Sequence, residues 1–168
     1  SILAGVDTIE HVSLVDDEGI KLALQKGTYF GMDIYNTDYT QAEGAKNGVL
    51  EENLQKDRDI ALIQRQNYQK ALKAGVKMIY STDAGVYPHG DNAKQLATMV
   101  QWGATPLQAL QSATITSAEA LGQANDVGQV KAGAYGDLVG VKGDPLKDIT
   151  LMQHPVFVMK GGDTVKRP

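Results

Sequence analysis

Two short apolar segments each end in a residue that can bind a metal ion or transfer a proton. Residues 76–80 (VKMIY) are followed by the motif STDAG, in which Asp83 is the only carboxylate. The earlier segment GVDTIEH has the same form and ends in His11. Such β-prone segments indicate buried strands, and in parallel α/β folds ligands gather at the carboxyl ends of the strands. A His and an Asp at two strand ends could share a metal ion or act as an acid–base pair, or they could simply cap a loop and a helix.

Alternating helix and strand signals surround these two segments. A strand is predicted over residues 28–35, and helices are predicted over residues 16–26, 50–74, 92–102, 106–112 and 117–122. The polar, glycine-containing stretch 36–47 is predicted to be a long loop, and long loops are often functional. This alternation is typical of an α/β fold with a parallel sheet.

The C-terminal part of the chain has a different character, because glycines divide it into short pieces. Strands are predicted over residues 137–141, 155–160 and 164–166, with a hairpin turn at residues 161–163. Three short strands make a poor sheet by themselves, so they require further strands from elsewhere. The sequence therefore divides into residues 1–127 and residues 128–168.

Composition excludes several classes of function. The 168 residues are 42% hydrophobic and 21% charged, which is ordinary for a globular protein with a real core. The net charge of −4 argues against nucleic acid or an anionic membrane as a partner. The absence of cysteine excludes thiolate chemistry, so any metal must bind His, carboxylate or water. Neither a signal peptide nor an apolar run of roughly 18–20 residues is visible, so the location is expected to be cytoplasmic or is left unknown.

Several segments, taken in order, resemble the amidohydrolase superfamily. Residues 5–11 and 81–85 carry the His and Asp motifs, and residues 133–139 (GAYGDLV) and 159–162 (MKGG) resemble the C-terminal tail of that family. Residues 32–39 (MDIYNTDY) and 86–92 (VYPHGDN) look like the prolidase-like branch. That branch includes carboxypeptidases that remove C-terminal Arg or Lys from short peptides.

The resemblance implies an α/β fold of a definite kind. Residues 1–127 would be the C-terminal part of a metal-dependent hydrolase (β/α)₈ TIM barrel, comprising strands six to eight and their helices. Residues 128–168 would be the C-terminal strands of a small β-sandwich. His11 would bind zinc at the end of the sixth strand, and Asp83 would bind zinc and act as the catalytic base at the end of the eighth. The implied reaction is hydrolysis of amide or peptide bonds with one or two zinc ions, on dipeptides or on peptides that end in Arg, Lys or Pro.

Other features of the family are absent from the chain. Its histidines are His11, His89 and His154, so the His-x-His pair of the first barrel strand has no counterpart, and the Lys and His of the fourth and fifth strands have none either. A barrel of this type needs about 250 residues. The resemblance therefore implies the C-terminal portion of a longer enzyme, whose site would be completed by the missing N-terminal barrel half or by another chain. Catalysis by the isolated chain is expected to be weak or absent.

Four further residues are candidates for substrate binding. His89 could bind a substrate carboxylate or stabilise the tetrahedral intermediate, or it could be an ordinary exposed loop histidine. Tyr35, Asn36 and Asp38 could line the substrate pocket, where Asp38 would suit a cationic side chain. The alternative is that these three belong to a hydrogen-bonded loop that only shields the mouth of the site.

Two other classes of function remain open from the sequence. A half-barrel could work as a non-catalytic binding module or assemble into a homo-oligomer, because open barrel edges expose unpaired strand backbone. The chain could also be an unrelated α/β domain, such as a flavodoxin-like one, although no glycine-rich phosphate loop opens a helix. Diverging side chains of His11 and Asp83 would refute the enzyme hypothesis, and a monomer with no exposed strand edge would argue against the half-barrel module.

Overall fold

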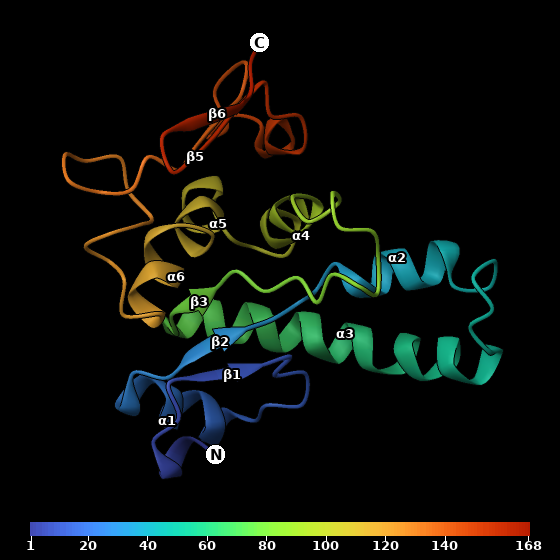
Figure 1. Cartoon of the computed structure of the whole chain (residues 1–168). Coiled ribbons are helices and arrows are strands. Elements are labelled where there is room, and N and C mark those ends of the chain that lie inside the picture. Colours follow the sequence, from blue (N-terminus) through green and yellow to red (C-terminus); the bar gives the residue numbers. More distant parts are fainter.

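The computed structural model describes residues 1–168, and its N-terminal part is an open parallel sheet with its connecting helices (Figure 1). The three strands lie side by side in chain order: β1 (Thr8–Glu10), β2 (Tyr29–Gly31) and β3 (Met78–Ile79). Between β1 and β2 the chain forms α1 (Asp17–Lys26), and between β2 and β3 it forms α2 (Asn36–Glu43) and α3 (Glu51–Ala74). The carboxyl ends of all three strands therefore meet at one edge of the sheet, where ligands bind in such folds.

The predicted helices are confirmed with small shifts at their ends. After β3 the chain forms α4 (Lys94–Gln101), α5 (Pro106–Ser112) and α6 (Ile115–Ala120). Local chemistry explains the sharpest boundaries. Asp16 accepts a hydrogen bond from the Gly19 amide at the start of α1, and Gly27 ends that helix in the left-handed conformation. Thr105 and Gln108 form a reciprocal capping box at the start of α5.

Two predictions of local structure are wrong. The stretch 36–47 is not a loop, because its first eight residues form α2. This helix has no apolar repeat; the Thr37 hydroxyl and the Gln41 amide instead donate hydrogen bonds to Asp57 on α3. The strand predicted over residues 28–35 is also too long, because only Tyr29–Gly31 pair with neighbours. The apolar residues that follow them are buried without being part of the ladder.

The core lies between the sheet and the helices that cover it. Three large side chains are fully buried: Phe30 on β2, Ile34 just beyond β2, and Tyr68 on α3. The other core residues include Ile20 and Ala23 of α1, Ala71 of α3, Leu96 and Met99 of α4, and Ala109 of α5. Because this single cluster reaches every helix except α2 and α6, the strand ends are held on a rigid base.

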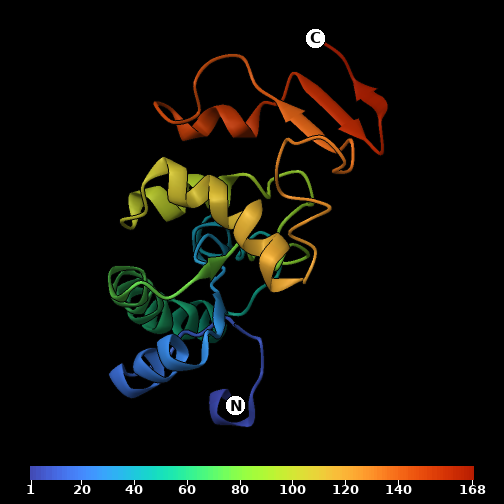
Figure 2. The same cartoon turned by 90° about the vertical axis from the view of Figure 1, so that its left-hand side faces the viewer.

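A second sheet is formed by the C-terminal residues. It is antiparallel in the order β4 (Leu138–Gly140), β5 (Phe157–Lys160) and β6 (Asp163–Lys166), with the predicted turn between β5 and β6. Figures 1 and 2 show this sheet at the end of the molecule opposite the N-terminus, with α4 to α6 between the two sheets. The division into residues 1–127 and 128–168 stays a prediction. Among the helices, none has the combination of length and apolar character that crossing a membrane requires.

Candidate metal centre

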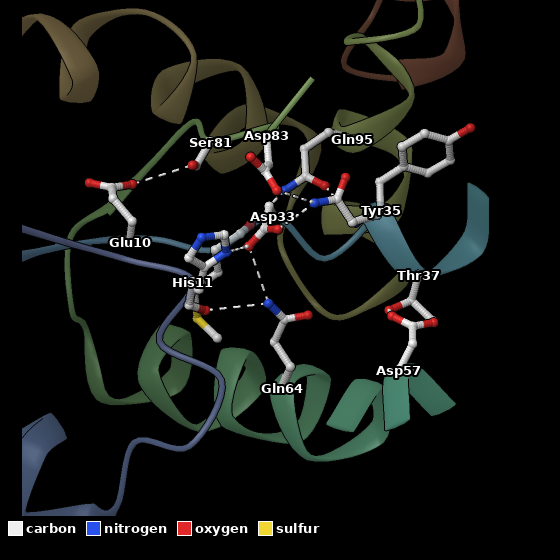
Figure 3. Close-up of polar contacts among 12 residues, drawn as sticks. Glu10, His11, Asp33, Tyr35, Thr37, Asp57, Gln64, Ser81, Asp83 and Gln95 are labelled. Carbon is white, nitrogen blue, oxygen red and sulfur yellow. Dashed lines mark hydrogen bonds and ion pairs between the residues drawn. The ribbon is translucent and has the colours of Figure 1, made fainter. Parts of the chain in front are cut away.

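His11 and Asp83 meet at the carboxyl edge of the parallel sheet. His11 directly follows β1, and Asp83 lies four residues beyond β3. Figure 3 shows both side chains approaching a third residue, Asp33, which lies two residues beyond β2. One potential ligand atom from each of the three lies within 4.8 Å of the others. The sequence prediction that His11 and Asp83 lie close enough to share a metal ion is consistent with this geometry.

The backbone at these strand ends is strained. Only three residues other than glycine have positive φ angles: His11 at 63°, Val12 at 51° and Asp83 at 48°. The left-handed conformation costs a residue with a Cβ about 1–2 kcal/mol. Strain of this kind persists only where surrounding contacts hold it, and it concentrates at functional sites. Both residues that the sequence singled out for chemistry are therefore held in conformations that the chain would not adopt freely.

Asp33 is a member of the cluster that the sequence analysis did not identify. Its Oδ1 lies 3.0 Å from His11 Nδ1 and accepts a hydrogen bond from Gln64 Nε2 at 3.3 Å. Its Oδ2 accepts from Asn36 Nδ2 at 2.5 Å. The residue is only 5% exposed. It lies inside the strand predicted over residues 28–35 as the only carboxylate of that segment, and this was the signal that could have revealed it.

Two buried glutamines hold this edge of the sheet from opposite helices. Gln64 on α3 donates to the backbone carbonyl of His11 as well as to Asp33. Gln95 on α4 donates to the Met32 carbonyl at 2.7 Å and accepts from the Tyr35 amide at 2.8 Å. Hydrogen bonds from α3 and from α4 thus hold residues 32–35, which include Asp33. Beyond the end of β2, the Gln95 amide forms the hydrogen bonds to backbone groups that a neighbouring strand would otherwise form.

The chemistry of the cluster fits zinc. Imidazole nitrogen and carboxylate oxygen are ligands that zinc accepts, and ligand atoms around a tetrahedral zinc ion lie about 3.4 Å apart. The ligand atoms of the cluster lie within 4.8 Å of one another, so they would have to move closer together to reach this value. In addition, the Asn36 side-chain oxygen is buried in the same region without a hydrogen-bond partner. His11 and Asp83 are exposed, whereas Asp33 lies behind them.

Among the predicted substrate-binding residues, Asn36 belongs to the cluster. Its Nδ2 donates to Asp33 and also to Asp83 Oδ2 at 3.1 Å, so one amide bridges the two carboxylates. Tyr35 lies beside it and packs edge-on against Tyr87, with ring centroids 5.0 Å apart. Burial raises the pKa of the Tyr87 phenol, so the Tyr87 ring stays neutral.

Asp38 and His89 do not join the cluster. The carboxylate of Asp38 accepts a hydrogen bond from Arg65 on α3 at 2.6 Å, and the same guanidinium lies 5.2 Å from the ring centroid of Trp102. A charge from the chain itself therefore already neutralises Asp38. His89 is exposed in the loop after β3 and makes no side-chain hydrogen bond within the chain.

Comparison with known proteins identifies the family. The model of the amidohydrolase family matches residues 1–165, which is nearly the whole chain. The chain is a member of the amidohydrolase family. The resemblance that the His11 and Asp83 motifs carried is thereby confirmed. The α/β fold class is confirmed too, as an open arrangement without a closed barrel that matches the C-terminal portion of the family's TIM-barrel proteins.

Individual amidohydrolase relatives are similar over the full chain. Ochratoxinase from Aspergillus niger is 33% identical over 173 residues. A Xaa-Pro dipeptidase with bound methionine in its active site has a TM-score of 0.90 at 35% identity over 98% of this chain. A prolidase complexed with N-methylphosphonate-L-proline has a TM-score of 0.85 at 29% identity over 99% of this chain.

This member spans less than half the length of these amidohydrolases. It covers 35% of ochratoxinase, 41% of the Xaa-Pro dipeptidase and 42% of the prolidase. The activity of those proteins is therefore a proposal for this chain.

Proposed function

We propose that this chain forms part of a zinc-dependent hydrolase that cleaves the C–N bond of amides, with small peptides as substrates. The observation that carries the proposal is the convergence of His11 and Asp83, from separate strands, on one exposed position. The strained backbone at both residues supports it, because strain of this kind concentrates at functional sites. Membership in a family that includes a dipeptidase and a prolidase agrees with this reaction.

Each residue has a distinct role in this proposal. His11 and Asp83 would hold zinc, as one ion or as part of a pair, and bound zinc makes water nucleophilic near neutral pH and polarises a carbonyl. Asp83 Oδ2 accepts a hydrogen bond from Asn36, whereas Asp83 Oδ1 accepts none from the chain. Asp83 Oδ1 is therefore free to take the proton of the attacking water. The carboxyl then gives this proton to the leaving nitrogen as the C–N bond breaks.

The charge distribution favours a neutral C-terminal residue in the substrate. A pocket that selects C-terminal Arg or Lys needs an unpaired carboxylate, and Asp38 is paired with Arg65. Tyr35, which packs against the buried Tyr87, instead offers an aromatic ring beside Asn36. We therefore favour Xaa-Pro dipeptides over Xaa-Arg and Xaa-Lys dipeptides as substrates.

Two protein ligands rarely hold zinc alone, and catalytic zinc sites have three. We propose that the remaining ligands come from a segment of the protein outside these residues or from a second chain, including a second copy. The 168 residues alone are then expected to hydrolyse peptides weakly or not at all.

The first test is the zinc content of the protein after dialysis against a mild chelator. In the assembly that includes the segment or second copy supplying the remaining ligands, we expect the unaltered protein to retain zinc and Asp83→Ala to lose it. Asp144→Ala is the control, because Asp144 is exposed on the C-terminal part and contacts none of the cluster. Equal zinc in all three proteins, or none in any, would overturn the proposed site. If zinc is retained but Xaa-Arg is cleaved faster than Xaa-Pro, the argument from Asp38 and Arg65 is wrong.

A further inference from the structure

The buried carboxylate of Asp33 has a defined place behind the exposed ligands. Its Oδ1 already interacts with two groups, His11 Nδ1 and Gln64 Nε2, and its Oδ2 accepts from Asn36. A carboxylate is costly to bury unless donors surround it, and here three side chains supply them. Since Oδ1 has both lone pairs engaged and the side chain is 6% exposed, Asp33 is poorly placed to bind a metal from solvent.

The contact between Asp33 and His11 determines how the imidazole can act. An ionised carboxylate only accepts hydrogen bonds, so the proton between the two residues must reside on His11 Nδ1. In the neutral imidazole the other nitrogen, Nε2, then carries the free lone pair. The His11 side chain is 60% exposed, which leaves Nε2 available to a ligand. Histidines that bind metals commonly donate their second ring N–H to a carboxylate in this way.

The rest of the network fixes Asp33 relative to His11. Gln64 bonds to Asp33 and to the carbonyl of His11, so a single amide sets the distance between the two residues. Gln95 holds the backbone on either side of Asp33. Gln64 and Gln95 are 7% and 0% exposed. Burial of this kind leaves the glutamines little freedom to rotate, so the carboxylate cannot follow a different imidazole orientation.

We propose that Asp33 is a positioning residue that keeps His11 in the Nδ1–H tautomer and directs Nε2 toward the cation. The role of Nε2 rests on the proposed function, because it assumes a zinc ion between His11 and Asp83. The tautomer does not rest on it, since it is a property of the metal-free protein. The two ideas can therefore fail separately.

The test reads the tautomer of His11 from long-range ¹H–¹⁵N spectra of the ¹⁵N-labelled, metal-free protein at about pH 8, above the reference imidazole pKa of about 6.5. We expect Nδ1–H in the unaltered protein and a shift toward Nε2–H in Asp33→Ala. Asp33→Asn retains a neutral acceptor and should give an intermediate population. The control is Asp57→Asn, which changes a carboxylate that links α2 to α3 without contacting His11. If Asp33→Ala does not fold, Asp33→Asn compared with Asp57→Asn carries the test. An unchanged tautomer in the Asp33 variants, or Nε2–H in the unaltered protein, overturns the proposal.

Zinc affinity, measured by competition with a chromophoric chelator, provides the second readout. Loss of a carboxylate behind a metal-binding histidine typically weakens metal binding by about 10–100-fold. We expect a loss of that size in Asp33→Ala, with partial rescue in Asp33→Asn. A loss as complete as in Asp83→Ala, without rescue, would show that Asp33 is itself a ligand and would overturn the positioning role. If no variant binds zinc, the proposed function fails while the tautomer measurement still decides the role of Asp33.

Discussion

Replacement of Gln95 by leucine should destabilise the protein by about 2–4 kcal/mol. The Gln95 side chain is completely buried and makes two hydrogen bonds, to the Met32 carbonyl and to the Tyr35 amide. Leucine has a similar size but can make neither bond. A buried backbone group left without a partner costs about 1–3 kcal/mol. We assign this full range to the buried Met32 carbonyl and about 1 kcal/mol to the Tyr35 amide, which is only partly buried.

Urea unfolding followed by circular dichroism gives the free energy of unfolding for this comparison. Gln101→Leu is the matched control, because Gln101 is exposed on the same helix and makes no side-chain hydrogen bond. Its effect should stay within about 0.5 kcal/mol of zero. Gln95→Glu should destabilise the protein at least as much as Gln95→Leu, because a carboxylate in this fully buried site carries an unpaired charge and cannot donate to the Met32 carbonyl. If Gln95→Leu destabilises no more than Gln101→Leu, the strand end is held by something other than the Gln95 amide.

Two further predictions concern buried phenols. The hydroxyl of Tyr68 is buried without a hydrogen-bond partner, whereas that of Tyr80 donates to the Asn92 carbonyl. Tyr68→Phe should therefore raise the free energy of unfolding by about 1 kcal/mol, and Tyr80→Phe should lower it by a similar amount. Thermal melts of both variants test this prediction. A destabilised Tyr68→Phe would indicate that a bound water satisfies the Tyr68 hydroxyl. Burial also raises the pKa of both phenols above the usual value of about 10. Above about pH 10 the unfolded chain loses these protons while the folded chain keeps them, so the free energy of unfolding should fall as pH rises. Urea unfolding at about pH 9 and about pH 11 should show a smaller fall in Tyr68→Phe than in the unaltered protein.

The residues that sequence reasoning found are those whose signal is local. Asp16 and Gly27 act through neighbours within one helical turn, so the bounds of α1 can be predicted from the chain alone. His11 and Asp83 stand at the ends of apolar segments, and the topology of a parallel sheet brings such ends together. In each case the sequence neighbours of the residue determine its position.

The residues that sequence reasoning missed depend on contacts between distant parts of the chain. The helix α2 looks like a loop because its stabilising partner, Asp57, lies on another helix, and no apolar repeat marks its buried face. Gln64 and Gln95 are indistinguishable in the sequence from exposed glutamines on the same helices. Only the fold shows that each faces a strand end with unpaired backbone groups.

The geometry of the site depends on helix contacts as well as on the strands. The strands bring His11, Asp33 and Asp83 to one edge, but strands of two or three residues have too few ladder hydrogen bonds to fix side chains there. The left-handed backbone at His11 makes this harder, since it interrupts the extended chain immediately after β1. The amide of Gln64 compensates by bonding to the same carbonyl and to the carboxylate that contacts the imidazole. The geometry of the proposed metal ligand thus depends on α3 as much as on the strand that carries it.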